Sequence, residues 1–196
     1  AVEARKRLGI TPRGRMLVAV GSLLPVKGID VLIDAVAVVA KTRDVSLYLV
    51  GDGKSRAALE AQAERLGLKD RVVHFAGKVD QRGLPDWYRA ADLTILASRS
   101  EGVPNVLRES LACGTPFVAT QVGGVAEIAE GTDCALVPPE NVGALAAAIE
   151  RSLAARGERG VPDQDAKRVA LPGLMTWKES TQQIVDLLSG TSRPAG

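Results

Sequence analysis

The chain has 196 residues, of which 46% are hydrophobic, 24% charged and only 3% aromatic, and this composition excludes disordered, collagen-like and coiled-coil proteins. Twenty-five lysine and arginine residues face 23 aspartate and glutamate residues, and a net charge of +2 lacks the basic surplus of a nucleic-acid-binding protein. One basic cluster near the start is interpreted as a solvated helix and linker: Arg5, Lys6, Arg7, Arg13 and Arg15.

The two cysteines, Cys113 and Cys134, have neither a metal-ligand nor a redox spacing, which favours a reducing compartment. No apolar run approaches 18 residues and there is no secretory signal, so we expect a cytoplasmic protein. Because the chain begins with Ala rather than Met, we also expect it to be a piece of a longer protein.

Short β-branched runs alternate with amphipathic helical patterns along most of the chain. Strands are expected over residues 16–20, 45–50, 72–76, 93–97, 116–120 and 134–138. Helices are expected over residues 29–42, 55–67, 84–91, 105–113, 124–130 and 141–155. This alternation predicts an α/β fold, Rossmann-like, with a doubly wound sheet of about six parallel strands and helices on both faces.

The apolar rhythm stops after residue 155, and this change predicts the domain organisation. Residues 1–155 are expected to form the Rossmann-like domain. Residues 156–196 are expected to be an exposed connection followed by a helix over 175–188 that packs on, or returns from, the same domain.

Ligands of open α/β sheets bind beyond the carboxyl ends of the strands, so the loops there are the candidate site. In the first loop, GSLLPVKG, Gly21 permits close backbone approach and Lys27 can reach an anion. Neither a Walker A loop nor a GxGxxG fingerprint is present, which disfavours P-loop enzymes and dehydrogenases.

The segment SEGVPNVLRE carries the strongest signal. Glu101 lies in the loop after a strand, and Pro104 suits the start of the helix that carries Glu109 in its second turn. Backbone amides at a helix N-terminus attract anions, and carboxylates beside them suit a ligand that also offers hydroxyls. A phosphorylated sugar or a nucleotide offers both groups.

With VGDG and FAGKV between these two motifs, and with ACGTPFVAT, VGG and a late helix containing Trp177 after them, the chain resembles the C-terminal, donor-binding domain of the group 1 retaining glycosyltransferases. The resemblance implies a GT-B fold and a nucleoside diphosphate sugar, such as a UDP- or GDP-sugar, as donor. It implies that an N-terminal acceptor domain is absent from this chain, that the chain alone is inactive, and that any contact with the inner face of a membrane belongs to that missing part.

Site roles follow from the same resemblance. Lys27 matches the lysine that contacts the donor diphosphate, Glu101 the glutamate beside the hexose, and Glu109 the ribose-binding glutamate, so Glu101 and Lys27 are the catalytic candidates. Val79 and Leu84 match positions near the base. The loop that meets the sugar and the distal phosphate consists of Gly102, Val103, Pro104, Asn105 and Val106.

One position departs from the family pattern, because Ser22 stands where the family commonly has a second diphosphate-binding cation, an arginine. This departure leaves open a non-catalytic nucleotide-sugar-binding module on the same fold. A third alternative, a phosphosugar isomerase or epimerase, is disfavoured because this sequence shows no acid–base pair placed for such chemistry. No cofactor or metal is expected, because lysine and helix amides replace a metal in such sites and the DxD at Asp163 and Asp165 lies in a connection.

Overall fold

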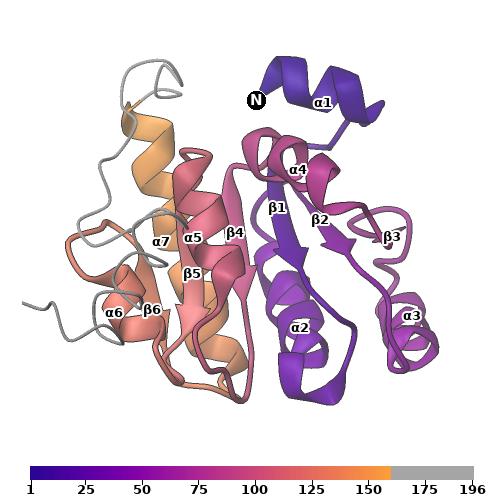
Figure 1. Ribbon diagram of the computed structural model, residues 1–196. Helices are drawn as coiled ribbons and strands as arrows, with labels where there is room; N and C mark the ends of the chain where they lie inside the picture. The colour runs from indigo at the N-terminus through magenta and orange to yellow at the C-terminus, as the bar shows by residue number, and fades with distance from the viewer. Residues whose placement is uncertain (160–196) are drawn as a thin grey trace, which may run out of the picture.

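The computed structural model describes residues 1–159, which fold around a six-stranded parallel sheet (Figure 1). The strands are β1 Arg15–Val20, β2 Val45–Val50, β3 Val73–Gly77, β4 Leu93–Leu96, β5 Phe117–Thr120 and β6 Ala135–Val137. Their order is β3-β2-β1-β4-β5-β6, and each neighbouring pair is parallel. The order reverses between β1 and β4, which makes this pair of strands the topological switch point.

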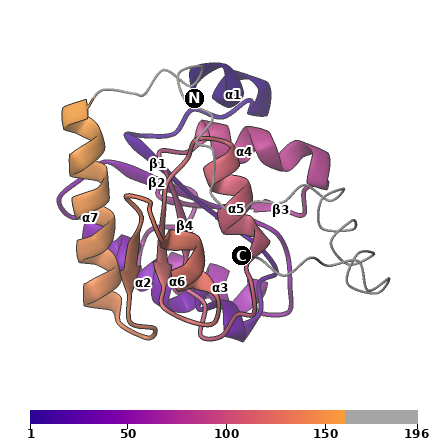
Figure 2. The same cartoon turned by 60° about the vertical axis from the view of Figure 1, so that its left-hand side comes forward.

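Helices connect the strands and cover both faces of the sheet. They are α1 Val2–Leu8, α2 Ile29–Val39, α3 Arg56–Arg65, α4 Leu84–Ala90, α5 Asn105–Ala112, α6 Val125–Ala129 and α7 Val142–Arg159, with short 3-10 turns η1 Pro25–Lys27 and η2 Gln81–Gly83. Figure 2 shows α2 and α7 on one side of the sheet and α4 and α5 on the other. None of the helices among residues 1–159 is both long enough and apolar enough to cross a bilayer.

Alternation along the strands explains the two layers. In β1, Leu17 and Ala19 point into the core under α2, α3 and α7, whereas Met16 and Val18 point into the core under α1 and α4. A third apolar cluster lies under α5 and α6 around Phe117. Burial on both faces is why the strands read as continuous apolar runs rather than as alternating ones.

The predicted fold class is confirmed, and the predicted strand boundaries agree with the structure to within one residue. Helix ends differ more. The helix expected to end at residue 155 continues to Arg159, so the boundary drawn after residue 155 falls inside α7. The sequence AARGER continues a helix because one glycine among good helix formers lowers helix stability without ending it. The predicted helix over 175–188 lies outside the described residues.

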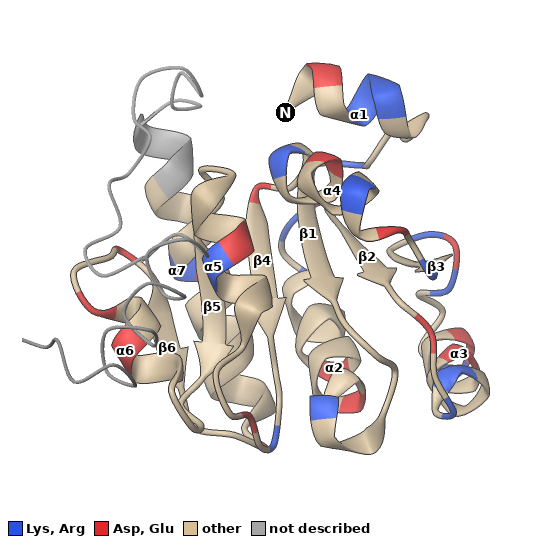
Figure 3. Cartoon of the chain, viewed as in Figure 1, with Lys and Arg blue, Asp and Glu red and all other residues tan. Residues whose placement is uncertain are grey.

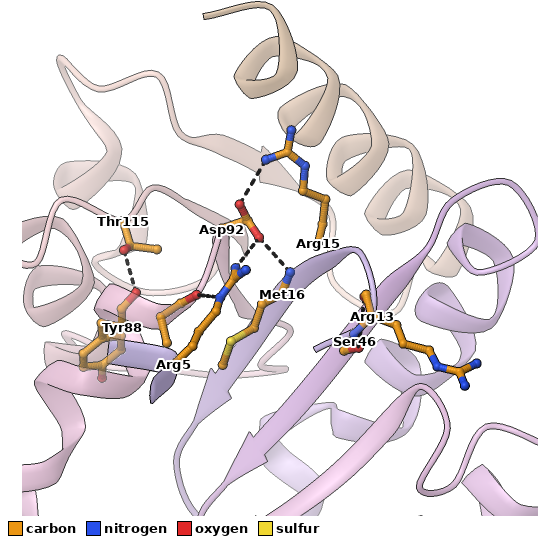
Figure 4. Close-up of polar contacts among 9 residues, drawn as sticks. Arg5, Arg13, Arg15, Met16, Ser46, Tyr88, Asp92 and Thr115 are labelled. Atoms are coloured by element: carbon orange, nitrogen blue, oxygen red, sulfur yellow. Dashed lines mark hydrogen bonds and ion pairs between the residues drawn. The ribbon is translucent and has the colours of Figure 1, made fainter. Parts of the chain in front are cut away.

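At the amino-terminal edge of the sheet, Asp92 joins α1 to β1 and β4 (Figure 4). Its carboxylate accepts hydrogen bonds from Arg5 Nη2 at 2.9 Å, Arg15 Nη1 at 3.1 Å and the Met16 amide at 2.7 Å. Only 12% of the Asp92 side chain is exposed. The prediction that the first basic cluster is merely solvated is therefore wrong for Arg5 and Arg15, because both arginines are ion-paired with this carboxylate.

A second, more exposed ion pair links α1 to α4. Arg7 Nη2 lies 2.6 Å from Asp86 Oδ1 on α4, and 47% of the Arg7 side chain is exposed. Figure 3 shows the basic and acidic segments of α1 and α4 facing each other above the sheet. Solvent screens this pair far more than it screens the Asp92 contacts.

At the opposite edge, Arg99 ties the loop after β4 to the loop after β1. Its guanidinium donates two hydrogen bonds to Asp30 on α2, at 2.9 and 2.8 Å, and others to Glu140 and to the Pro25 carbonyl. The Arg99 amide also donates to the Val26 carbonyl at 2.8 Å. This arginine therefore fixes η1 and the start of α2 against the end of β4.

We expect Asp92→Asn to lower the free energy of unfolding by about 1–3 kcal/mol, because two arginines lose a mostly buried charged acceptor while the Met16 amide keeps one. Urea unfolding measures this loss. The matched control is Asp86→Asn, which breaks the exposed pair with Arg7 and should cost much less. Equal losses in the two variants would contradict the account.

The pair with Arg99 also predicts an acid dependence. Its hydrogen bonds hold the pKa of Asp30 below the ordinary value of 3.8. A carboxyl with a lowered pKa in the folded state stabilises the fold above its ordinary pKa, and this contribution disappears as the pH falls through the folded-state pKa. Between about pH 5 and pH 2, Asp30→Asn should therefore lose less stability than the unmodified chain in urea titrations. If the free energies of unfolding of the two proteins fall by the same amount over this pH range, Asp30 has no such stabilising role.

Candidate functional site

The residues singled out from the sequence lie on three loops at the carboxyl edge of the sheet and on the helix that follows the third loop. The β1–α2 loop carries Gly21, Ser22 and Lys27, and the β3–α4 connection carries Val79 and leads into Leu84. The β4–α5 loop carries Glu101, and residues 102–106 lead from it into α5, which holds Glu109. β1 and β4 are neighbours, so the first and third loops flank the switch point.

The centre of the site is an ion pair between those two loops. Lys27 Nζ lies 2.7 Å from Glu101 Oε1, and the same carboxylate oxygen accepts a hydrogen bond from Ser98 Oγ at 2.5 Å. Only 10% of the Glu101 side chain is exposed, and Ser98 is fully buried. Thr120 Oγ1 in turn donates to the Ser98 carbonyl at 2.6 Å. The carboxylate is thus held by Ser98, which is itself hydrogen-bonded to β5 through Thr120, and by Lys27.

Two glycines permit this close approach of the loops. A Cβ on Gly28, whose φ is +59°, would lie 2.1 Å from the Ala97 carbonyl oxygen at the end of β4. A Cβ on Gly123, whose φ is +52°, would lie 2.0 Å from the Glu101 carbonyl oxygen. Any side chain at either position would push a neighbouring loop away from Glu101.

The N-terminus of α5 is open to solvent beside this ion pair. Gly102, Val103 and Asn105 are exposed, whereas Pro104 is buried and occupies the cap position immediately before the helix. Among residues 1–159, no side chain donates or accepts a capping hydrogen bond at this end of α5. The first amides of a helix lack partners within it, so they can bind an anion that sits beside Lys27.

Glu109 is held from a different helix. The Tyr88 hydroxyl, on α4, donates to Glu109 Oε2 at 2.8 Å. Tyr88 is only 1% exposed, and burial together with this hydrogen bond raises the pKa of its hydroxyl well above the usual value. The hydroxyl therefore remains a donor at any working pH, while the second carboxylate oxygen of Glu109 can accept further hydrogen bonds.

The remaining candidates lie around these groups. Val79 and Leu84 are half-buried and pack against the apolar cluster that contains Tyr88. Ser22 is exposed, next to Gly21, whose φ is +151°. The candidates thus lie on the loops at the carboxyl edge of the sheet, except Leu84, Asn105 and Val106, which lie in the first turns of α4 and α5, and Glu109, which lies one turn further along α5.

Three residues that sequence reasoning did not single out support the site: Ser98, Tyr88 and Arg99. Ser98 carried a usable signal, since it is a polar residue directly after the apolar run LTILA, where a strand ends. Tyr88 reads as a core residue of a short helix, and its hydroxyl partner cannot be read from periodicity. Arg99 has no local signal, because its partners lie 41 and 69 residues away.

The described residues place one lysine, the first amides of α5 and two carboxylates on the loops after β1 and β4 and on α5. Such a set can bind a phosphate through the lysine and the amides, and hydroxyl groups through the carboxylates. Within residues 1–159, His, Cys, Asp and Glu side chains do not gather in threes at metal-binding distance. Asp163 and Asp165 lie outside the described residues.

Two solved structures share this architecture. The Anabaena protein HepE in complex with UDP matches with a TM-score of 0.81 and 28% identity, over 96% of this chain and 52% of that one. Sucrose-phosphate synthase from Thermosynechococcus elongatus matches with a TM-score of 0.81 and 30% identity, over 98% of this chain and 50% of that one.

A curated relative is similar in sequence. D-inositol 3-phosphate glycosyltransferase 2 from Catenulispora acidiphila is 40% identical over 157 residues, which are 74% of this chain and 36% of the relative. The chain thus spans about a third of that relative and about half of the two solved structures. The family model for group 1 glycosyl transferases matches residues 14–155. The chain therefore belongs to the group 1 glycosyltransferases.

Proposed function

We propose that this chain is the donor-binding domain of a retaining group 1 glycosyltransferase and that it binds a nucleoside diphosphate sugar at the carboxyl edge of its sheet. The observation that carries the proposal is the meeting of Lys27 and Glu101, 2.7 Å apart, beside the open N-terminus of α5. One group suits a phosphate and the other a sugar hydroxyl. HepE, a similar protein, has been solved with UDP and with UDP-glucose, which favours this class of ligand.

Lys27 is proposed to bind and stabilise the leaving diphosphate. An ammonium has three N–H donors, and Glu101 accepts one of them, so two remain for phosphate oxygens. When the bond between sugar and phosphate breaks, negative charge grows on the diphosphate. A positioned lysine and helix amides stabilise that charge without rearranging, and this is the way they would accelerate transfer.

The carboxylates are proposed to hold the rest of the donor. Glu101 is fixed by Ser98 and Lys27 and would accept hydrogen bonds from the hexose, with help from the amides of residues 102–106. Glu109 would accept hydrogen bonds from the ribose. Val79 and Leu84 would lie beside the base, next to an apolar cluster that suits a flat ring.

Transfer also needs an acceptor, and we propose that a separate N-terminal domain of the same enzyme binds it. The relatives that match are about twice as long as this chain. The acceptor side of the reaction, retention of configuration and a cytoplasmic location are part of this proposal, as is donor binding without a metal ion.

A nucleotide panel tests the proposed function. Calorimetry of the chain with UDP-, GDP- and ADP-glucose should show binding of at least one donor, and EDTA should leave its dissociation constant unchanged, because lysine and amides supply the positive charge. Loss of binding in EDTA that magnesium restores would contradict the metal-free site. Failure of all three donors would contradict donor binding.

A serine at position 22, where the family commonly has an arginine, favours one competing function, a nucleotide-sugar-binding module without catalysis. Ser22 carries no charge, and Arg99, which contacts the same loop, is committed to Asp30 and Glu140. In this alternative the chain still binds nucleoside diphosphate sugars. The full-length protein, however, releases no nucleoside diphosphate when acceptors are supplied.

The same position yields a mutational prediction. Ser22 is exposed and has room for a longer side chain, so Ser22→Arg should raise the affinity for UDP about 3- to 10-fold at low salt, through one charge-assisted hydrogen bond. Higher salt should shrink the gain, because exposed charges are screened. The affinity for UMP, which lacks the distal phosphate, should rise less than the affinity for UDP.

Ser22→Gln is the matched control, because it lengthens the side chain without adding charge. It should leave both affinities close to those of the unmodified chain. Equal affinities for the arginine and glutamine variants, at two salt concentrations, would mean that the diphosphate does not lie beside this loop.

A further inference from the structure

Tyr88 is the one buried tyrosine of residues 1–159 whose hydroxyl is recorded in contact with a carboxylate of the candidate site. It reaches Glu109 from another helix and from 21 residues away in the sequence. α4 and α5 are packed neighbours, so this contact spans the interface between them. The hydroxyl thus emerges from the core at the place where the proposed ribose-binding carboxylate lies.

The backbone of Tyr88 is fixed by a chain of buried hydrogen bonds. Thr115 Oγ1 donates to the Tyr88 carbonyl at 2.7 Å, as Figure 4 shows. Ser110 Oγ, on α5, donates to the Thr115 carbonyl at 2.8 Å and lies 2.7 Å from Thr94 Oγ1 on β4. These hydroxyls are at most 1% exposed, so water does not compete for them.

The ring of Tyr88 is fixed as well. It lies in the apolar cluster that contains Met16, Val18 and Trp87, and close packing restricts the rotamers open to such a ring. Glu109 differs in this respect, because it is only half-buried and its side chain has three rotatable bonds. A rigid donor is thus paired with a mobile acceptor, and the rigid partner decides where the carboxylate lies.

We propose that Tyr88 is a positioning residue that holds the Glu109 carboxylate ready to accept hydrogen bonds from the ribose hydroxyls of the donor. This inference rests on the proposed function. One oxygen of the carboxylate is taken by the tyrosine, so the other is presented outward to the ligand. Ordering the carboxylate before the ligand arrives removes part of the entropy that binding would otherwise cost.

A merely structural hydroxyl would alter stability without altering ligand preference, and this difference defines the test. The probes are whichever of UDP, GDP and ADP binds most tightly, and its 2′,3′-dideoxy analogue, which has no ribose hydroxyls. Tyr88→Phe should weaken binding of the ribonucleotide about 3- to 10-fold, because one ordering hydrogen bond is lost. Binding of the dideoxy analogue should not change.

The matched control is Tyr48→Phe. Tyr48 belongs to the same apolar cluster and is 7% exposed, but its ring stacks on His74, away from Glu109. This variant should leave the affinities for both probes unchanged. Circular dichroism establishes that both variants are folded at the temperature of the titrations.

A double-mutant cycle separates positioning from any effect independent of Glu109. In a Glu109→Ala background, Tyr88→Phe should have no further effect on ribonucleotide affinity, because the group that it positions is gone. The inference is overturned if Tyr88→Phe leaves the ribonucleotide affinity unchanged or raises it, weakens both probes equally, or acts equally in both backgrounds. Failure of the unmodified chain to bind UDP, GDP and ADP overturns the proposed function itself, and the inference with it.

Discussion

The ion pair between Lys27 and Glu101 joins two loops whose residues lie 74 positions apart in the sequence, and the candidate site is organised around it. It forms because β1 and β4 are neighbours, so that the loops after them leave the sheet side by side. Gly28 is required for the same reason, since a Cβ there would meet the Ala97 carbonyl at 2.1 Å. Arg99 then fixes the first loop from below through Asp30. Strand order, the absence of a side chain at position 28 and the half-buried ion pairs of Arg99 thus all support the contact between Lys27 and Glu101.

The two edges of the sheet differ in how their polar groups are used. At the amino-terminal edge, charged groups pair with one another and Asp92 is enclosed by two arginines and an amide. At the carboxyl edge, Glu109 and the first amides of α5 retain hydrogen-bonding capacity that faces solvent. Parallel strands produce this asymmetry, because every loop on one edge follows a strand and every loop on the other precedes one. Substitutions of Asp92 should therefore change folding without changing the chemistry of the carboxyl edge.

The sheet, its class and the positions of Lys27, Glu101 and Glu109 along the elements were predictable from the sequence, because the succession of short apolar runs, loops and amphipathic helical patterns is a local signal. Their partners were not. Arg5 reads as a solvated basic residue, yet its acceptor Asp92 lies 87 positions away. Tyr88 reads as core, which is true of its ring, whereas its hydroxyl partner depends on how α4 packs against α5. Hydrogen bonds between distant elements depend on packing angles that periodicity does not encode.

Two cations at the carboxyl edge, Lys27 in the first loop and Arg99 beside it, are already paired with carboxylates, and this pairing affects how a phosphate would bind there. Lys27 is paired with Glu101, and Arg99 with Asp30 and Glu140. A diphosphate would therefore share the lysine with a carboxylate rather than meet a free charge, and the repulsion between the two anions would offset part of the attraction. Helix amides carry no counter-charge and escape this competition. In a site with Ser22 in place of a second cation, the N-terminus of α5 should consequently contribute a larger share of the phosphate affinity than the single lysine does.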